Sequence, residues 1–250
     1  MDLQTRGIVL KVTDTKESDR LIYVLTEKSG MLRAFAKGAR KVKSAYLAPT
    51  GLLCCSDFVF VRGKNSWNVA GASASDVFFG LRDDITAMSV AMYLAQLFSL
   101  VCPEEQEAYE PFRLLANSYA LMSEKKRDPI LVKACAELRL LSIEGFMPDL
   151  TCCSVCSSDK GPFYIDTTDG VLYCESCAKL SGRAPRVLPD SILEAMRYII
   201  YSQPGKIFDF TMKKESIMQL SAVSERYVTD QIGRKLDTLD FLHSIISGEL

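Results

Sequence analysis

Hydrophobic and polar residues recur with two different periods along this chain. Over the first 80 residues, short runs rich in β-branched and aromatic side chains are separated by turn signals, a pattern typical of strands. The predicted strands cover residues 7–12, 21–26, 31–36, 52–62 and 66–73. An open sheet of such short strands would leave its edges uncovered, so the pattern favours a small closed barrel.

Beyond about residue 81, apolar residues recur at steps of three and four, which predicts helices. The first helix is expected over residues 85–102, a stretch without any charged residue that also contains Thr86 and Gln96. These polar residues favour a buried core helix over a membrane span. Further helices are predicted at 112–122 (after a start signal at 103–105), at 130–143, at 191–201 and between 220 and 242.

Composition indicates an ordinary globular protein of one or two domains, with 250 residues, 48% of them hydrophobic and 24% charged. The net charge of −1 hides an uneven distribution. Residues 1–80 carry 12 Lys and Arg against 7 Asp and Glu, whereas residues 81–250 carry 18 against 24. The front of the chain is therefore basic, at +5, and the rest is acidic, at −6.

His243 is the only histidine, which excludes most catalytic triads and any zinc site built on two imidazoles. The chain also has no phosphate-binding loop and no glycine-rich dinucleotide motif, so nucleotide-dependent chemistry is unsupported. Asp83 and Asp84 could be read as a metal pair, but acidic residues in the first turn of a helix are the simpler interpretation. These observations favour a binding protein over an enzyme.

Five of the nine cysteines lie between residues 152 and 177. Two Cys-x2-Cys pairs, Cys153 with Cys156 and Cys174 with Cys177, are separated by 17 residues, a spacing typical of structural zinc sites. A hairpin predicted between them would bring the pairs together into a zinc-ribbon-like arrangement around one Zn²⁺. Cys152 is an alternative first ligand, and disulfides or metal-free thiols are alternatives to the metal. The opening residues lack a signal peptide, which indicates a reducing cytosol and favours the metal.

A run of cations without an acid crosses the third predicted strand and the loop after it. Its members are Arg33, Lys37, Arg40, Lys41 and Lys43. Such a cluster can neutralise phosphates, and the nearby Phe35, Tyr46 and Trp67 could stack on nucleobases. The alternative is a solvated charged loop beside core aromatic residues.

Several segments resemble the bacterial RecO family of recombination mediators. They are residues 7–10, 17–21, 25–30 and 35–44, and the run 137–150 that leads into Cys153–Cys156. The segments occur in the family's order along the whole chain. The resemblance implies an α+β multidomain protein with a five-stranded OB-fold at residues 1–80. It also implies a helical domain at 81–250, into which the zinc-ribbon-like module is inserted at 150–182.

The resemblance also implies a function without bond-breaking catalysis. Family members bind single- and double-stranded DNA, anneal complementary strands and help to load RecA on DNA covered by single-stranded-DNA-binding protein. The expected partners are RecR and the C-terminal tail of single-stranded-DNA-binding protein, in the bacterial cytoplasm at the nucleoid. The motif match makes Lys37, Arg40, Lys41 and Lys43 DNA contacts, with Arg20 as a further candidate. The alternative is a zinc-ribbon protein-interaction adaptor that does not bind DNA.

Overall fold

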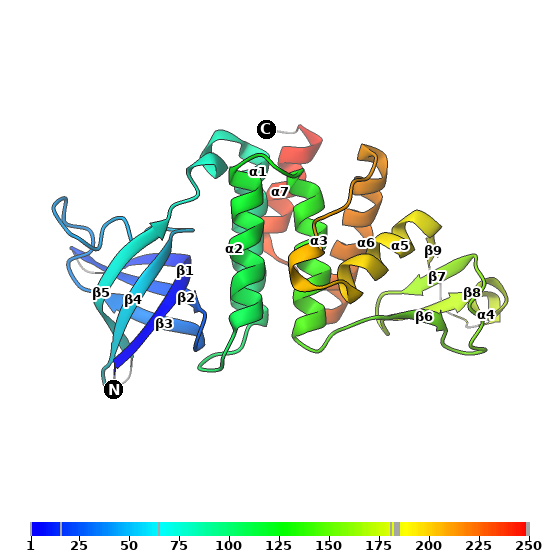
Figure 1. The fold of residues 1–250 in the computed structure, drawn as a ribbon, viewed down its shortest axis with the longest axis horizontal. Coiled ribbons are helices and arrows are strands. Elements are labelled where there is room, and N and C mark those ends of the chain that lie inside the picture. The colour runs from blue at the N-terminus through cyan, green and yellow to red at the C-terminus, as the bar shows by residue number, and fades with distance from the viewer. Residues whose placement is uncertain (1, 16, 65, 181, 183–185, 249–250) are drawn as a thin grey trace. The chain divides into compact units, whose positions relative to one another are not determined.

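The computed structural model describes residues 2–15, 17–64, 66–180, 182 and 186–248 (Figure 1). The chain divides into two compact units, the first of which joins Met1–Lys126 with Leu236–Leu250. The second unit is Arg127–Lys235. The domain boundaries predicted at residue 80 and at 150–182 are not tested by this division and stay predictions.

The first unit contains a closed barrel of five strands, in the order β1-β2-β3-β5-β4, which confirms the predicted barrel. The strands are β1 (Asp2–Thr15), β2 (Asp19–Thr26), β3 (Gly30–Ala36), β4 (Cys55–Arg62) and β5 (Trp67–Asp76). Neighbouring strands are antiparallel except for β3 and β5, whose short parallel pairing closes the barrel. Alternate residues such as Val24, Phe58 and Phe60 fill the interior, as expected for half-buried strands.

Strand β1 is longer than the predicted segment 7–12. Its first half, from Asp2 to Ile8, pairs with β4, and its second half, from Gly7 to Thr15, pairs with β2. One long strand thus pairs with a neighbour on each of its two sides. The ends of β1 are polar and partly exposed, so their hydrophobicity does not reveal them as strand.

Beyond the barrel, the described residues of the first unit include a 3-10 turn, η1 (Phe79–Asp83), and three α-helices. The helices are α1 (Ile85–Val101), α2 (Tyr109–Ser123) and α7 (Asp237–Ser247). Asp84 lies just before α1, at its N-cap and not in its first turn as predicted, and accepts from the backbone N–H groups of Thr86 and Ala87. Across the described residues, no helix combines the length and apolarity needed to cross a membrane.

Helix α2 begins at Tyr109, so the start signal at 103–105 was wrong. Residues 103–108 run instead against the barrel. The Met31 N–H donates to the Pro103 carbonyl at 2.9 Å, and Glu104 forms isolated bridges with β3. Proline and acidic residues suit a helix start, but here backbone pairing with a strand determines the conformation.

The second unit packs α3 (Pro129–Ile143) against α6 (Lys214–Ile232) and α5 (Asp190–Tyr201). Gly233, in the left-handed region at φ 70°, ends α6, so the apolar pattern between 220 and 242 belongs to two helices. A four-stranded sheet in the order β6-β8-β7-β9 completes the unit. Its elements are β6 (Asp149–Cys153), β7 (Phe163–Asp166), β8 (Val171–Cys174), the short helix α4 (Glu175–Leu180) and β9 (Arg186–Leu188).

Candidate metal centre and nucleic-acid interface

Four cysteine sulfurs converge at one end of the small sheet. Cys153 ends β6 and Cys156 follows in a tight turn, which is closed by the Ser157 N–H donating to the Cys153 carbonyl at 2.9 Å. Cys174 ends β8 and Cys177 lies in α4, one helical turn further on. The antiparallel β7–β8 hairpin, as predicted, returns the chain to the first pair.

The distances fit a tetrahedral metal ion. The four sulfurs all lie within 4.8 Å of one another, and those of Cys156 and Cys174 are 3.6 Å apart. A tetrahedral Zn²⁺ with bonds of about 2.3 Å would need sulfurs roughly 3.8 Å apart. All four cysteines are free thiols in the structure. The cluster can therefore hold a metal ion.

Cys153, and not Cys152, joins this cluster among the residues that the structure describes. Successive side chains of a strand point to opposite faces, so only one of the two neighbours can face the other sulfurs. The sulfur of Cys152 lies 3.8 Å from the Thr151 hydroxyl instead. Strand geometry thus favours one of the two registers that the sequence left open.

The thiols of Cys153 and Cys177 hold their protons with different strength. Burial opposes ionisation of Cys153, but hydrogen bonds from backbone N–H groups, among them those of Cys156 and Cys174, outweigh it and lower its pKa to about 6. A hydrogen bond with the Cys174 sulfur raises the pKa of Cys177 to about 12. Several thiolates so close together repel one another, and a bound dication removes this repulsion. The chemistry of the donors therefore fits a cation.

Helix α5 of the second unit contacts the small sheet that carries the four cysteines. The Arg197 guanidinium donates to the carbonyls of Leu150 at 2.8 Å and Thr151 at 3.1 Å. These carbonyls belong to β6, which leads directly to the first cysteine pair. The site is therefore supported by a helix as well as by its own small sheet.

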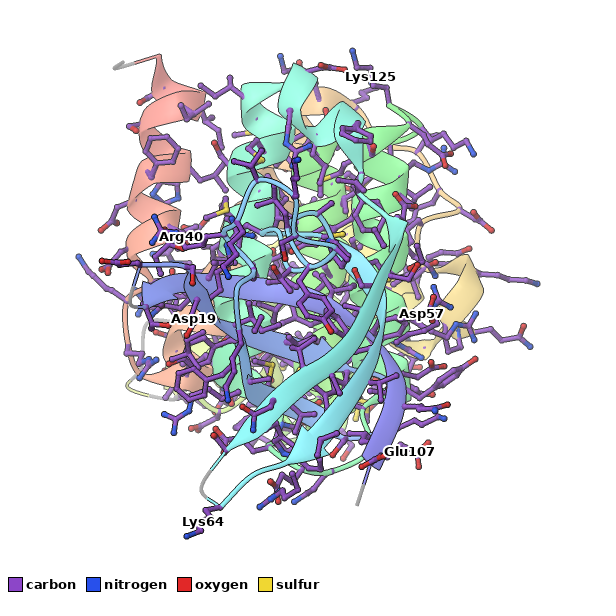
Figure 2. All side chains as sticks on the ribbon, turned by 90° about the vertical axis from the view of Figure 1, so that its left-hand side faces the viewer. Asp19, Arg40, Asp57, Lys64, Glu107 and Lys125 are labelled. Atoms are coloured by element: carbon purple, nitrogen blue, oxygen red, sulfur yellow. The ribbon has the colours of Figure 1, made fainter. Side chains whose placement is uncertain are left out.

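The predicted cations of the first unit gather around one loop. Arg33 points outward from β3, and Lys37, Arg40, Lys41 and Lys43 are exposed in the loop that follows it, residues 37–44. The Asp19 carboxylate accepts the Gly38 N–H at 2.7 Å, and the Arg40 N–H donates to the Ser18 carbonyl at 3.0 Å. Figure 2 shows Asp19 and Arg40 on the same side of the barrel. The start of β2 thus holds the basic loop in place.

Arg20 differs from the other candidates because its side chain is only 19% exposed. It donates to the Leu47 carbonyl at 3.0 Å and to the Thr50 hydroxyl at 3.3 Å. Asp14 lies 3.7 Å from Arg20 and 3.3 Å from Arg40. These contacts of Arg20 hold the segment that follows the basic loop, around residues 47–50. Its role in binding DNA stays a prediction.

Replacing Asp19 with alanine is expected to loosen the basic loop. The lost hydrogen bond joins a carboxylate to a backbone N–H, a type that contributes about 1.5–3 kcal/mol. Amide hydrogen exchange over residues 37–40 should therefore become roughly tenfold faster. Asp19→Asn is the matched control, because it removes the same charge but keeps an oxygen that can accept from Gly38. Equal exchange in both variants would contradict this role of Asp19.

The barrel carries aromatic–cation pairs that were not predicted from the sequence, although Trp67 was expected to offer a stacking face. The register pairs Lys11 with Tyr23, and Tyr23 with Arg33, in one outward row across β1, β2 and β3. The Lys11 ammonium lies 5.6 Å from the centre of the Tyr23 ring. The Arg62 guanidinium lies 4.8 Å from the centre of the Trp67 ring. The row of Lys11, Tyr23 and Arg33 becomes visible only from the strand register. Arg62 and Trp67, in contrast, are close enough in the sequence to be expected as partners in a hairpin.

Two family models match the chain. "Recombination protein O N terminal" matches residues 1–78, and "Recombination protein O C terminal" matches residues 82–240. A "DNA repair protein RecO" of Acetivibrio thermocellus is 30% identical over 244 residues, 97% of either chain. Proteins of the same name from Clostridium kluyveri and Symbiobacterium thermophilum are each 27% identical, over 98% and 97% of this chain and 95% and 97% of their own lengths. These similarities span both units.

Proposed function

Because the chain belongs to the RecO family of DNA repair proteins, we propose that its barrel binds single- and double-stranded DNA. The observation that supports this most is the exposed basic loop 37–44, held against a closed barrel whose strand order is that of an oligonucleotide-binding fold. Cations on a loop can reach the phosphates of a flexible strand, and each contact releases a counterion. The sites in this proposal are Arg33, Lys37, Arg40, Lys41 and Lys43, with Arg20 in support.

We propose that the protein also acts as a recombination mediator. The protein anneals complementary strands and helps to load RecA on DNA that single-stranded-DNA-binding protein covers, with RecR and the tail of that protein as partners. It does so through binding, without breaking covalent bonds, in the bacterial cytoplasm at the nucleoid. Residues 1–80 form the DNA-binding domain in this scheme, residues 81–250 the helical domain, and residues 150–182 the metal module.

We further propose that the metal is one structural Zn²⁺ held by Cys153, Cys156, Cys174 and Cys177. Four thiolates around one ion leave no open position for water, which is typical of structural rather than catalytic sites. The ion would supply cross-linking energy to a small sheet whose strands are at most five residues long.

Salt-titrated DNA binding tests the main proposal. Each phosphate contact to a single strand contributes about 0.7 to the slope of log K against log salt, so replacing Lys37, Arg40, Lys41 and Lys43 by alanine should lower the slope by roughly 3. The dissociation constant near 0.1 M salt should rise at least tenfold. Fluorescence anisotropy of a labelled oligonucleotide measures both quantities.

The matched control neutralises four exposed lysines of the second unit, Lys179, Lys206, Lys213 and Lys214. It changes the net charge by the same amount and should leave most of the slope intact. An unchanged slope in the barrel variant would overturn the site assignment. Absence of DNA binding at low salt, together with tight binding of protein partners, would support the adaptor alternative.

A further inference from the structure

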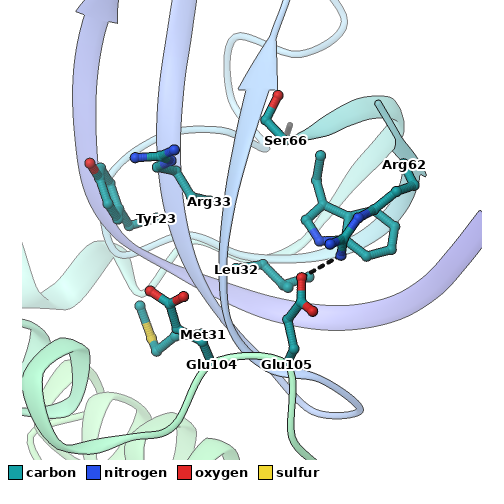
Figure 3. Close-up of a pocket in the computed structure, with 9 residues that line it drawn as sticks. Tyr23, Met31, Leu32, Arg33, Arg62, Ser66, Glu104 and Glu105 are labelled. Carbon is teal, nitrogen blue, oxygen red and sulfur yellow. Dashed lines mark hydrogen bonds and ion pairs between the residues drawn. The ribbon is translucent and has the colours of Figure 1, made fainter. Parts of the chain in front are cut away.

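A pocket of about 260 Å³ lies on the outside of the barrel (Figure 3). Tyr23 and Arg33 line it from β2 and β3, and Arg62 and Trp67 line it from the adjoining ends of β4 and β5. Its volume is slightly below the roughly 300–1,000 Å³ of sites for drug-sized ligands, which suits a small planar group such as one nucleobase. The basic loop 37–44 does not contribute to its lining.

The chemistry of the pocket combines aromatic rings with cations. Arg62 covers the Trp67 ring, and Lys11 extends the row formed by Tyr23 and Arg33. The indole N–H of Trp67 is buried and has no hydrogen-bond partner within the described part of the chain. Stacking platforms interleaved with positive charge are the surface that single-stranded nucleic acid binds.

An acidic segment closes one side of this pocket. Glu104 and Glu105 line it, and the Glu105 carboxylate forms an ion pair with Arg62, drawn as a dashed line in Figure 3. The segment is fixed to the barrel at Gly30, whose φ is 57° and where an added Cβ would clash with the Pro103 carbonyl oxygen. A glycine is therefore required for the segment to approach so closely.

Stability alone does not account for this arrangement. Arg62 and Glu105 are 50% and 53% exposed, and an ion pair in that setting contributes little to folding. Glu105 also adopts a φ of 54°, a conformation that is unfavourable for residues other than glycine. Unfavourable backbone conformations of this kind concentrate at functional sites.

We propose that this pocket binds one nucleotide of single-stranded DNA and that the Glu105 carboxylate holds the place of its phosphate until DNA arrives. This inference rests on the proposed DNA binding by the barrel. A phosphate replaces the carboxylate on Arg62, the guanidinium follows the phosphate, and a base stacks in the pocket against Trp67. No bond is made or broken. Glu105 thus competes with the phosphate of any strand that enters the pocket and weakens its binding.

The chain has one tryptophan, so its fluorescence reports directly on this pocket. Titration of the whole protein with oligo-dT at low salt is expected to quench the emission of Trp67, because a stacked base contacts its ring. An abasic oligomer of equal length should bind with much less quenching. Binding itself is followed in parallel by the anisotropy of a label on the DNA.

Glu105→Gln is expected to bind oligo-dT roughly three- to tenfold more tightly, because the competing charge is gone. Glu107→Gln is the matched control: it removes the same charge from the same segment, but residue 107 is not among those lining the pocket. An equal change in both variants would mean that affinity depends only on the net charge of the segment. That result would overturn the proposed competition between Glu105 and the phosphate.

Two outcomes separate this inference from the function on which it rests. If anisotropy shows DNA binding while Trp67 emission stays constant, the pocket is not the site and the inference fails, whereas DNA binding by the barrel stands. If neither signal changes at low salt, the proposed function fails and the inference fails with it.

Discussion

Replacing Cys174 with serine is expected to release the metal ion and to unfold the module around β6–β9. Binding of Zn²⁺ to small four-ligand sites contributes an apparent 10–16 kcal/mol, and that binding energy is folding energy. The four sulfurs are provided by a strand end, a turn, a second strand end and a six-residue helix. None of these elements is long enough to persist alone once the ion is lost.

The measurements are the metal content of the purified, reduced protein and amide exchange over residues 149–188. The unmodified protein should contain about one zinc per chain, and the variant much less, with fast exchange confined to the module. Cys152→Ser is a matched control, because its sulfur lies next to the cluster without joining it. If Cys152→Ser loses the metal and Cys174→Ser keeps it, the assignment of the ligands is wrong.

Replacing Lys133 with methionine is expected to destabilise the second unit by about 3–5 kcal/mol. Lys133 and Glu137 are completely buried between α3 and α6, with 2.9 Å between the ammonium and the carboxylate. Glu225 on α6 provides a second carboxylate at 3.1 Å, and the Ser224 hydroxyl donates to Glu137 at 2.6 Å. Methionine fills most of the space but leaves the Glu137 charge buried without its cation.

The loss should appear in urea denaturation as a lower midpoint with little change in slope. The double variant Lys133→Met with Glu137→Leu should recover much of the loss, since it removes both fully buried charges, and Glu225 is 21% exposed and can be solvated. Lys179→Met is the control, because it breaks an exposed i,i+4 pair with Glu175 and should cost less than about 1 kcal/mol. A similar loss in Lys133→Met and Lys179→Met would contradict the role of burial.

Features with short-range causes could be predicted from the sequence. All five barrel strands were located from their short apolar runs and turn signals. The ends of β1 were missed, and the strand predicted at 52–62 begins three residues too early, because β4 starts at Cys55. Helices α1, α3 and α5 were found through their apolar period. The cysteine cluster followed from spacing, because a Cys-x2-Cys turn brings its two sulfurs together without help from the rest of the fold.

Other features depend on residues far apart in the chain. Strands β6 and β9 and helix α4 were missed because they are at most six residues long and pair or pack with distant segments. Lys133 and Glu137 look like an exposed i,i+4 pair in the sequence. Only the packing of α6 over α3 shows that they are buried and that Ser221 and Glu225 complete the network.

The sequence by itself determined the barrel, the helical class of the remainder, the cluster of four cysteines to within one register, and the basic loop. Tertiary structure alone decided that Cys153 faces the cluster, that Arg20 supports a loop, and that Glu105 meets Arg62. The physical reason is the range of the forces involved. Periodicity and turn chemistry act within a few residues, whereas a pocket or a buried ion pair requires backbone pairing and packing to bring distant side chains together.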